Sequence, residues 1–500
     1  MRSNSFWTLF LLLLALSGCG GGGGGTGAPG GTVSPATKTL VSITVTPANP
    51  TTAVGATVQF SALGTYSDST TQDLTATVTW GATNTSVATI SNVAGTNGKA
   101  TPAAAGSTDI VATIQVTEPA PGRISGSTTL TVTDGSSKVN VLPITVNGSL
   151  CSSGSYLNKP CVSVTVCTPG TSTCQVVSDI LLDTGSAGLR IFRQALNVPL
   201  TQATVAGGAL AECVQFGDGS SLWGPVQTAG VILGSEPIVR MPLQVIDAGF
   251  GTRPSGCLNA AATPASPGAG FNGMMGIGLF RHDCGGLCAS SVNNGFYSAC
   301  NGSICSGTTV PLASQVQNPV ALLPRDNNGV LVQLPGVPTG GVPSVDGTLV
   351  LGIGTQANNT PAAVTTFPTN AVGDFTTTFN GASFSNSFID TGSNGLFFTA
   401  PASLLPLCPP PNAGFYCPAV TTSLSATNSG APAGSPSNQV TFQIGNLNNL
   451  LGSGNNAFSE VGGSGIGGFD WGLPFFYGRN VFVGFEGRSS TLGSGPYWAY

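Results

Sequence analysis

The apolar residues of this chain occur in short runs and in alternation with polar residues. In residues 39–134 the stretch VSITVTPANPTTAVGATVQFSALGTYSDS alternates apolar and polar positions between Pro and Gly turns, and TVTWGATNTSVATIS continues the pattern. From residue 139 onward, short runs of Val, Thr, Ile and Phe are separated by Gly, Asn, Pro and Ser. Two-residue alternation and short β-branched runs between turn residues are typical of strands. The pattern therefore predicts an all-β fold.

The longest apolar run lies at the N-terminus, where FWTLFLLLLAL follows Arg2 and ends at LSGC, residues 16–19. A short apolar segment behind a positive residue predicts a signal peptide. LSGC resembles a bacterial lipobox, which would make residues 1–19 a lipoprotein signal with Cys19 lipidated. An ordinary signal peptide with an incidental cysteine is the alternative. The Gly-rich residues 20–38 then predict a flexible tether.

Length and charge narrow the classes of function. The 500 residues are too many for one ordinary domain. Only 7% of the residues are charged, and the net charge is −5. Because the chain has no basic block, we do not expect nucleic acid as a partner. We expect the tether to be followed by one β unit at 39–134 and by a larger one that begins at residue 139.

The cysteines indicate an oxidising compartment. Of the 13 cysteines, all except Cys19 lie beyond residue 150, and this even number allows up to six disulfides. Disulfides that close local loops are expected for two pairs, Cys167 with Cys174 and Cys408 with Cys417. Disulfides are also expected among four cysteines that are clustered in the sequence. A metal site is the rival interpretation of this cluster, because the spacing of its first two cysteines suits metal ligands. The members of this cluster are Cys284, Cys288, Cys300 and Cys305.

Residues 39–134 resemble a bacterial immunoglobulin-like domain of the second group. The resemblance rests on the VTP opening, the strand pair VGATVQFSALGTYSDS and the segment VTWGATNTSVATI, and it covers nearly the whole unit. It implies a β-sandwich that serves as a spacer or as an adhesive module on a bacterial surface. The segment has no cluster of ionisable residues, so we prefer the spacer.

Two isolated carboxyls stand in matching frames further along. Asp183 ends the apolar run in VVSDILLDTGSAGLRIF, residues 176–192, and Asp390 ends that in FSNSFIDTGSNGLFF, residues 384–398. Each apolar strand would carry its Asp into a dry interior, where the following Thr-Gly-Ser turn offers N–H and hydroxyl groups to the carboxyl. If the two turns meet face to face, the carboxyls share one proton. One can then act as a base on water while the other donates to a carbonyl oxygen.

The segment 139–500 resembles a pepsin-like, two-lobed aspartic peptidase. Besides the two Asp-Thr-Gly turns, four pieces follow the order of that family: VQFGDGSSLWG, FNGMMGIGL, SVDGTLVLGIG and DWGLPFFYGRNVFVGFE. The resemblance implies a first lobe at 139–335, a second lobe at 336–500 and a cleft between them. It implies hydrolysis of extended polypeptides without a cofactor or a metal. It also points to a lipoprotein branch in the bacterial cell envelope, anchored in the outer membrane through Cys19.

Carried onto this chain, the resemblance makes Asp183 and Asp390 the catalytic pair. Phe216 replaces the tyrosine that is usual in the family's flap, which removes a hydroxyl. Arg190 lies behind the first turn, where an apolar aromatic residue is usual. Both departures bear on rate and specificity more than on the fold. The resemblance assigns support of the pair to Thr184, Gly185, Ser186, Thr391, Gly392 and Ser393, and the flap to Phe216, Gly217, Asp218 and Gly219.

Other chemistries fit the residues less well. His282 is the only histidine, so a Ser-His-Asp triad, a Cys-His pair or a His-based zinc site would each depend on it. Gly-rich runs such as GGSGIGG are not followed by the Gly-Lys-Ser/Thr of a phosphate loop. Two alternatives to an active peptidase stay open. One is a catalytically silent pepsin-like fold that binds protein or glycan, and the other is a structural or adhesive surface protein with an unrelated β fold.

Overall fold

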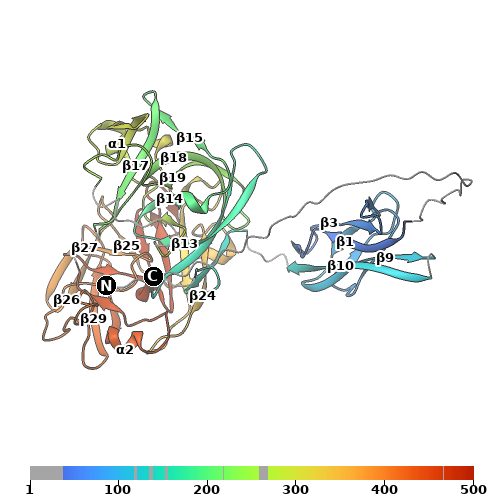
Figure 1. The fold of residues 1–500 in the computed structure, drawn as a ribbon. Coiled ribbons are helices and arrows are strands. Elements are labelled where there is room, and N and C mark those ends of the chain that lie inside the picture. The colour runs from blue at the N-terminus through green and yellow to red at the C-terminus, as the bar shows by residue number, and fades with distance from the viewer. Residues whose placement is uncertain are drawn as a thin grey trace, which may run out of the picture. The chain divides into compact units, whose positions relative to one another are not determined.

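The computed structural model describes residues 38–117, 121–133, 139–152, 156–217, 219–257, 269–465 and 467–500. The predicted signal peptide with Cys19, and nearly all of the predicted tether, lie outside these residues. The chain divides into two compact units, Met1–Ser136 and Ser137–Tyr500. Strands dominate both units (Figure 1), which confirms the all-β prediction. In the described part of the chain, no helix has the length and apolarity needed to cross a membrane.

The first unit packs short sheets around one apolar core. Among its described residues, β1, β4 and β5 form one sheet, β2, β10, β9 and β6 a second, and β3, β8 and β7 a third. Alternate residues of the long β9–β10 hairpin point inward, and Ile110, Ala112 and Leu130 pack there with Trp80. The strands are β1 (Leu40–Thr46), β2 (Thr51–Ala53), β3 (Val58–Gln59), β4 (Ser61–Tyr66), β5 (Thr71–Asp73), β6 (Thr79–Ala82), β7 (Ala88–Ile90), β8 (Lys99–Pro102), β9 (Gly106–Val116) and β10 (Gly122–Thr133).

The larger sheet of the second unit joins, within the described residues, all strands from β11 to β25 with β33 and β36. Its first ten strands are β11 (Val141–Val146), β12 (Pro160–Cys167), β13 (Cys174–Asp183), β14 (Ala187–Phe192), β15 (Thr201–Gln202), β16 (Thr204–Val205), β17 (Gly208–Gln215), β18 (Ser221–Ile232), β19 (Val239–Ile246) and β20 (Gly273–Ile277). The others are β21 (Tyr297–Asn301), β22 (Ile304–Gly307), β23 (Gly329–Leu334), β24 (Val345–Leu351), β25 (Thr366–Pro368), β33 (Arg479–Gly484) and β36 (Tyr497–Ala499).

The smaller sheet comes from the C-terminal part of this unit. Its strands are β26 (Phe375–Phe379), β27 (Ala382–Ile389), β28 (Leu396–Phe397), β29 (Thr422–Ser429), β30 (Ser437–Ile444), β31 (Gly462–Gly463) and β32 (Asp470–Trp471). β34 (Ser489–Ser490) and β35 (Gly493–Ser494) form a short hairpin. The helices are short: α1 (Gly286–Ser290), α2 (Leu447–Leu451), and 3-10 turns at Arg193–Ala195, Leu312–Ser314, Val320–Leu322, Ala357–Asn359 and Leu473–Phe476.

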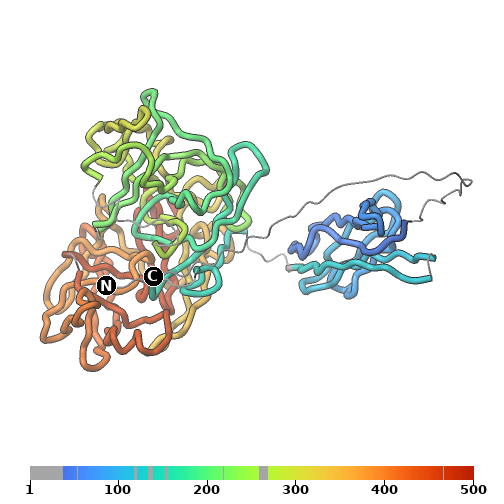
Figure 2. Tube along the Cα trace, in the orientation of Figure 1, coloured from blue at the N-terminus to red at the C-terminus, as the bar shows by residue number. Residues whose placement is uncertain are grey.

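One core connects the two ends of the second unit. Figures 1 and 2 show β17, β18 and α1 at one end, and β26, β29 and α2 at the other. β11 pairs with β24, and β23 pairs with both β24 and β33, so the larger sheet combines strands from before and after residue 335. A single buried apolar cluster extends from Leu182 and Ile277 to Phe398 and Trp471. This shared core fixes the two sheets relative to each other and thereby positions the site described below.

Six disulfides of the second unit join all the cysteines except Cys19. The two predicted local loops, Cys167–Cys174 and Cys408–Cys417, are confirmed. The four clustered cysteines pair as Cys284–Cys288 and Cys300–Cys305. Their sulfurs are therefore not thiolates, and the metal interpretation of this cluster was wrong. The remaining disulfides are Cys151–Cys161 and Cys213–Cys257.

Candidate active site

Asp183 and Asp390 are positioned by one arrangement of strands that occurs twice. β13 ends at Asp183 and pairs in parallel with β20, while β14, which returns after the turn, pairs antiparallel with β20 and parallel with β19. β27 ends just before Asp390 and pairs in parallel with β32, while β28 pairs antiparallel with β32 and parallel with β31. The repeated sequence frame thus corresponds to a repeated pattern of strand pairing, and each carboxyl follows the first strand of its pattern.

Reciprocal hydrogen bonds of two threonines join the turns. The N–H of Thr184 donates to Oγ1 of Thr391 (3.1 Å), and the N–H of Thr391 donates to Oγ1 of Thr184 (2.9 Å). The Thr184 hydroxyl donates to the carbonyl oxygen of Ile389 (3.1 Å), and the Thr391 hydroxyl donates to that of Leu182 (2.7 Å). Both threonines are buried. Because these buried polar groups satisfy one another, the two turns are held face to face.

The two carboxyls lie close enough to share a hydrogen-bond donor. The N–H of Gly185 donates to Oδ1 of Asp183 (2.8 Å) and to Oδ1 of Asp390 (3.0 Å). A Cβ on Gly185 would lie 2.7 Å from Cγ of Asp390, and a Cβ on Gly392 would lie 3.1 Å from Cγ of Asp183. The glycine of each turn therefore lies against the opposite carboxyl, and a side chain on Gly185 would push the pair apart.

Each carboxyl is also held by its own turn. The Ser186 hydroxyl donates to Oδ2 of Asp183 (2.5 Å), and the Ser393 hydroxyl donates to Oδ2 of Asp390 (2.8 Å). The N–H of Ser186 donates to Oδ1 of Asp183 (3.1 Å), and the N–H of Gly392 donates to Oδ1 of Asp390 (2.7 Å). The structure thus brings all six predicted turn residues together with the two predicted carboxyls.

Burial and repulsion determine the charge of the pair. Asp183 is only 4% exposed. Burial, followed by the negative charges of Asp183 and Asp470 and a hydrogen bond with Asp183, raises the pKa of Asp390 well above its usual range, against the effect of the Ser393 hydroxyl. Two close carboxyls with this little solvent repel each other when both are ionised. The arrangement therefore favours one proton shared by the pair.

Two cavities adjoin the turn that carries Asp183. The larger has a volume of about 680 Å³ and includes Asp183 and Asp390 in its wall. The smaller has a volume of about 340 Å³ and includes Thr184, but neither carboxyl of the pair, in its wall. The two cavities share part of their walls. The residues common to both walls are Gly185, Ser186, Phe216, Gly217 and Phe388.

The predicted flap is the loop of the β17–β18 hairpin. Gln215 pairs with Ser221, and inside the loop the N–H of Phe216 donates to the carbonyl oxygen of Ser220 (2.9 Å). The N–H of Gly219 donates to the carbonyl oxygen of Phe216 (3.0 Å). Phe216 and Gly217 of this loop line both cavities, and the wall of the larger cavity also includes the carboxyl pair. The predicted flap residue Asp218 lies outside the described residues.

Two titratable side chains of the larger cavity, Tyr156 and Asp470, were not predicted as site residues. Burial, together with the charge of Asp183, raises the pKa of Asp470 to about 8 despite a hydrogen bond from Ser393. Burial and then the charge of Asp183 also raise the pKa of Tyr156. Asp470 could have been predicted from the sequence, because it is a lone carboxyl in an apolar run, as Asp390 is. No sequence pattern distinguishes Tyr156.

Arg190, the unusual residue behind the first turn, lies in a fully buried network. Its Nη2 is 2.8 Å from Oε1 of Glu212 and 3.2 Å from Oδ2 of Asp283. Its Nη1 donates to the carbonyl oxygen of Ala187 (2.8 Å), at the start of β14. Burial and then the charge of Glu212 raise the pKa of Asp283 well above its usual range. The guanidinium thus ties the strand that follows the first turn to two carboxyls outside the cleft pair.

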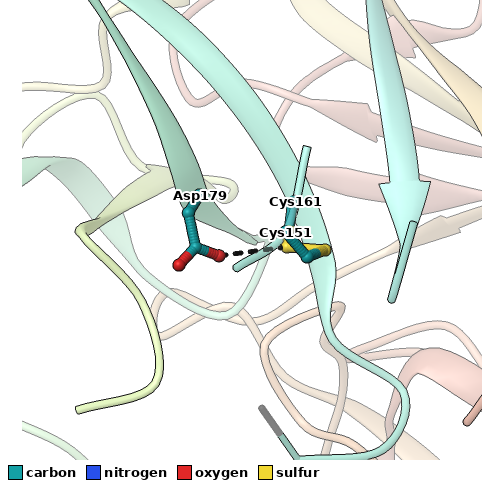
Figure 3. Close-up of side chains that lie close together, drawn as sticks. All are labelled: Cys151, Cys161 and Asp179. Atoms are coloured by element: carbon teal, nitrogen blue, oxygen red, sulfur yellow. Dashed lines mark hydrogen bonds between the residues drawn. A yellow bond between two sulfur atoms is a disulfide. The ribbon is translucent and has the colours of Figure 1, made fainter. Parts of the chain in front are cut away.

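Another buried group lies at β13, where Cys151, Cys161 and Asp179 meet (Figure 3). Their ligand atoms lie within 4.8 Å of one another, as a metal site would require. However, Cys151 and Cys161 form a disulfide and offer no thiolate. Oδ1 of Asp179 instead pairs with Nζ of Lys159 at 2.6 Å, and both side chains are buried. We interpret this group as an anchor for the segment that precedes β12.

Comparisons with known proteins separate the two units. Residues 136–500 match the model of a family described as "Protein of unknown function (DUF3443)". Residues 40–124 match "Bacterial Ig-like domain (group 2)", which confirms the predicted immunoglobulin-like domain. Ice-binding protein 1 of Shewanella frigidimarina (strain NCIMB 400) is 42% identical over 96 residues, which is 19% of this chain and 10% of that protein. The chain therefore spans about a tenth of this relative, and the similarity falls on the Ig-like region.

Proposed function

The chain belongs to the DUF3443 family, whose description assigns no function, and from its carboxyl pair we propose that it is an aspartic-type endopeptidase. The proposal includes a pepsin-like, two-lobed fold for the second unit. The observation that carries it is the N–H of Gly185, which donates to both Asp183 and Asp390. This single contact places two carboxyls side by side, as chemistry with one shared proton requires.

In the proposed reaction, a water molecule attacks the scissile carbonyl without a covalent intermediate. The ionised carboxyl of the pair takes a proton from the water, and the protonated carboxyl donates to the carbonyl oxygen. We assign the proton to Asp390, because burial and the charges of Asp183 and Asp470 raise its pKa. Asp183 is then the base, held by the Ser186 hydroxyl and by the N–H groups of Gly185 and Ser186.

The cavities support an extended polypeptide as the substrate. They have Phe216, Gly217 and Phe388 in common, and we infer that a bound chain continues from one cavity into the other past the carboxyls. Such a path suits cleavage within a chain better than removal of a terminal residue. Substrates of this kind bind by strand-like pairing with the backbone of the protein, and we propose that the flap loop takes part in it.

The cell envelope is the proposed location. Disulfides are rare in reducing compartments, so the six disulfides and the bacterial Ig-like domain are typical of a protein outside the cytoplasm. We further propose that lipid on Cys19 anchors the chain in the outer membrane and that residues 39–134 act as a spacer.

Digestion of a mixed peptide library tests the proposed activity. The full chain should cleave internal bonds in acid, and pepstatin, an inhibitor of aspartic peptidases, should suppress the cleavage. Mass spectrometry of the products identifies the cleaved bonds, and the Asp183→Asn variant controls for contaminating peptidases. Absence of cleavage at every pH from 3 to 8 would contradict the proposal. Binding of extended peptides or glycans without cleavage would then replace it with the silent-binder alternative.

A further inference from the structure

Strand register makes Asp470 and Met274 equivalent positions of the repeated site. Met274 of β20 lies opposite Leu181 of β13, two residues before the carboxyl of the first turn. Asp470 of β32 lies opposite Phe388 of β27, two residues before the carboxyl of the second turn. Both side chains line the larger cavity. The repeat therefore places a thioether in one half and a carboxyl in the other.

Both positions also contact the serine of their own turn. The Ser186 hydroxyl lies 3.9 Å from Sδ of Met274, and the Ser393 hydroxyl, which donates to Asp390, also acts on the carboxyl of Asp470 and lowers its pKa. Because a thioether is sufficient in the first half, neither the strand pairing nor the turn requires a carboxyl at this place. The fold therefore does not account for the carboxyl of Asp470, whereas a ligand in the cavity would.

Asp470 has an acceptor that the described chain leaves unused. Its Oδ1 is shielded from solvent and accepts no hydrogen bond from the described residues. β27 and β28, the strands that pair with β32, carry no charged residue. The described lining of the cavity also includes no Lys or Arg. Buried carboxyl oxygens in folded proteins are nearly always paired, and because the Asp470 side chain lines the cavity, a rotation of its carboxyl would present this unpaired oxygen to a donor on a ligand.

We propose that Asp470 is a specificity-determining residue that binds a basic side chain, arginine or lysine, of a polypeptide in the cleft. This inference rests on the peptidase function proposed above. A guanidinium or ammonium group supplies the missing donor, and its charge favours the ionised carboxyl more than a neutral amide would. Asp470 lines the larger cavity and not the smaller one. The basic residue therefore lies on the larger-cavity side of the scissile bond.

The interaction is linked to the release of a proton. Burial, with the charge of Asp183, raises the pKa of Asp470 to about 8. The other titratable groups in the wall of the same cavity are Asp183, Asp390 and Tyr156. In an acidic assay Asp470 is neutral in the empty cavity and has to lose its proton to pair with a cation. The advantage of a basic side chain over a neutral one should therefore grow as the pH rises toward 8.

Peptide pairs that differ only by arginine or citrulline test the inference, because citrulline has nearly the shape of arginine without its charge. With the full chain at pH 6, we expect one position on one side of the cleaved bond at which arginine raises kcat/KM about tenfold over citrulline. Asp470→Asn should lower this ratio to about one. Asp470→Met, which introduces the side chain of the equivalent position, should do the same. Asp470→Glu should keep part of the preference.

Asp346→Asn is the matched control, because it removes an exposed carboxyl from β24 that lines neither cavity. It should keep the full ratio. A wild-type ratio near one at every position, with cleavage intact, would overturn the role of Asp470 and leave the peptidase proposal standing. Retention of the ratio in Asp470→Asn would overturn it equally.

Absence of cleavage would contradict the peptidase proposal and would move the test of Asp470 to binding. The same labelled peptides are then compared by fluorescence anisotropy, with the wild type and the Asp470→Asn variant. The same binding assay is used if Asp470→Asn abolishes cleavage of both peptides, since no ratio of kcat/KM can then be measured. Tighter binding of the arginine peptide that disappears in Asp470→Asn supports the inference, and equal binding of the two peptides by the wild type overturns it.

Discussion

Thr184 and Thr391 exchange hydrogen bonds across the centre of the second unit, each N–H donating to the hydroxyl of the other. Their hydroxyls in turn donate to backbone carbonyl oxygens just before the opposite turn. A displacement of one turn would therefore break buried hydrogen bonds on both sides. The hydrogen bonds between the two turns therefore fix the distance between the two carboxyls, and neither turn could fix it alone.

The first prediction concerns the pair itself. Asp183→Asn and Asp390→Asn should each fold normally, because the amide oxygen can still accept the N–H of Gly185. Each should lower kcat/KM by about 10²–10⁴-fold, the usual contribution of general acid–base groups. Steady-state cleavage of one peptide, with circular dichroism as the check on folding, measures both effects. If either folded variant kept most of its activity, Asp183 and Asp390 would not be the catalytic pair.

The second prediction concerns the pH dependence of cleavage. The raised pKa of Asp390 lets this carboxyl keep its proton at a higher pH than an ordinary aspartate does. Activity should be highest in acid and should fall as the pH rises through the pKa of Asp390. A profile of kcat/KM from pH 2 to 9 measures this fall. A constant rate from pH 5 to 9 would point to different chemistry.

The two turns can be predicted from local sequence because all the residues that specify each turn are consecutive. An apolar run, Asp, Thr and Gly specify a strand that ends in a tight turn, and this frame occurs at both Asp183 and Asp390. The loops closed by Cys167–Cys174 and Cys408–Cys417 were predictable for the same reason, since their ends are near in sequence.

Contacts between distant segments were not predictable in this way. The sequence shows that Arg190 is unusual for its position, but its partners Glu212 and Asp283 come from other elements, and no spacing links the three. Asp470 lies in a segment that was recognised, but its place in the cavity depends on its register with Phe388. Pairing across a sheet depends on the complete fold, and a single sequence does not reveal it.

The third prediction uses Gly185. In Gly185→Ala the new Cβ would lie 2.7 Å from Cγ of Asp390, so the pair has to separate although every catalytic group is present. A displacement of about 1 Å can lower a rate about a hundredfold, and we expect at least this loss in kcat/KM. Gly286→Ala is the control, because its Cβ meets nothing within 4 Å. Equal activity of the two variants would mean that the close approach of the turns is not needed.

The fourth prediction concerns stability. Glu236 is 5% exposed, and its Oε1 has no hydrogen-bond partner among the described residues. Burial, followed by the charge of Asp326 and a hydrogen bond with it, raises the pKa of Glu236 from 4.5 to about 7, against the effect of Arg325. Between these values the folded chain holds a proton that the unfolded chain releases. The contribution of Glu236 to stability is therefore complete below about pH 4.5 and is lost as the pH rises through about 7.

Glu236→Gln should remove this part of the pH dependence. The melting temperature of the variant should exceed that of the wild type by a few degrees at pH 8 and should match it more closely at pH 4. Thermal unfolding at both pH values measures the difference, and Asp346→Asn serves as a control that removes an exposed charge. Parallel curves for the Glu236 variant and the wild type would show that Glu236 titrates normally.

The fifth prediction concerns Phe216 in the predicted flap. This ring lies at the boundary of both cavities and packs against a cluster that contains Phe192, Val214, Leu222 and Ile246. It lacks the hydroxyl of the tyrosine that is usual in pepsin-like flaps. One hydrogen bond contributes about 0.5–1.5 kcal/mol, and about 1.4 kcal/mol corresponds to a tenfold change in rate. The absence of the hydroxyl should therefore slow a peptidase by about tenfold at most and should not silence it.

Phe216→Tyr should keep the rate of peptide cleavage or raise it modestly, whereas Phe216→Ala should lower it, because an aromatic ring in the wall of both cavities is lost. Val420→Ala, which shortens an apolar side chain that is 74% exposed, is the control and should leave the kinetics unchanged. Steady-state kinetics and pepstatin affinity on one cleaved peptide separate the three variants. If both Phe216 variants match the wild type in both measurements, the β17–β18 loop does not close over the substrate. The polypeptide would then have to be held by the cavity walls alone, and the extended-chain binding proposed here would lose its support from the hairpin.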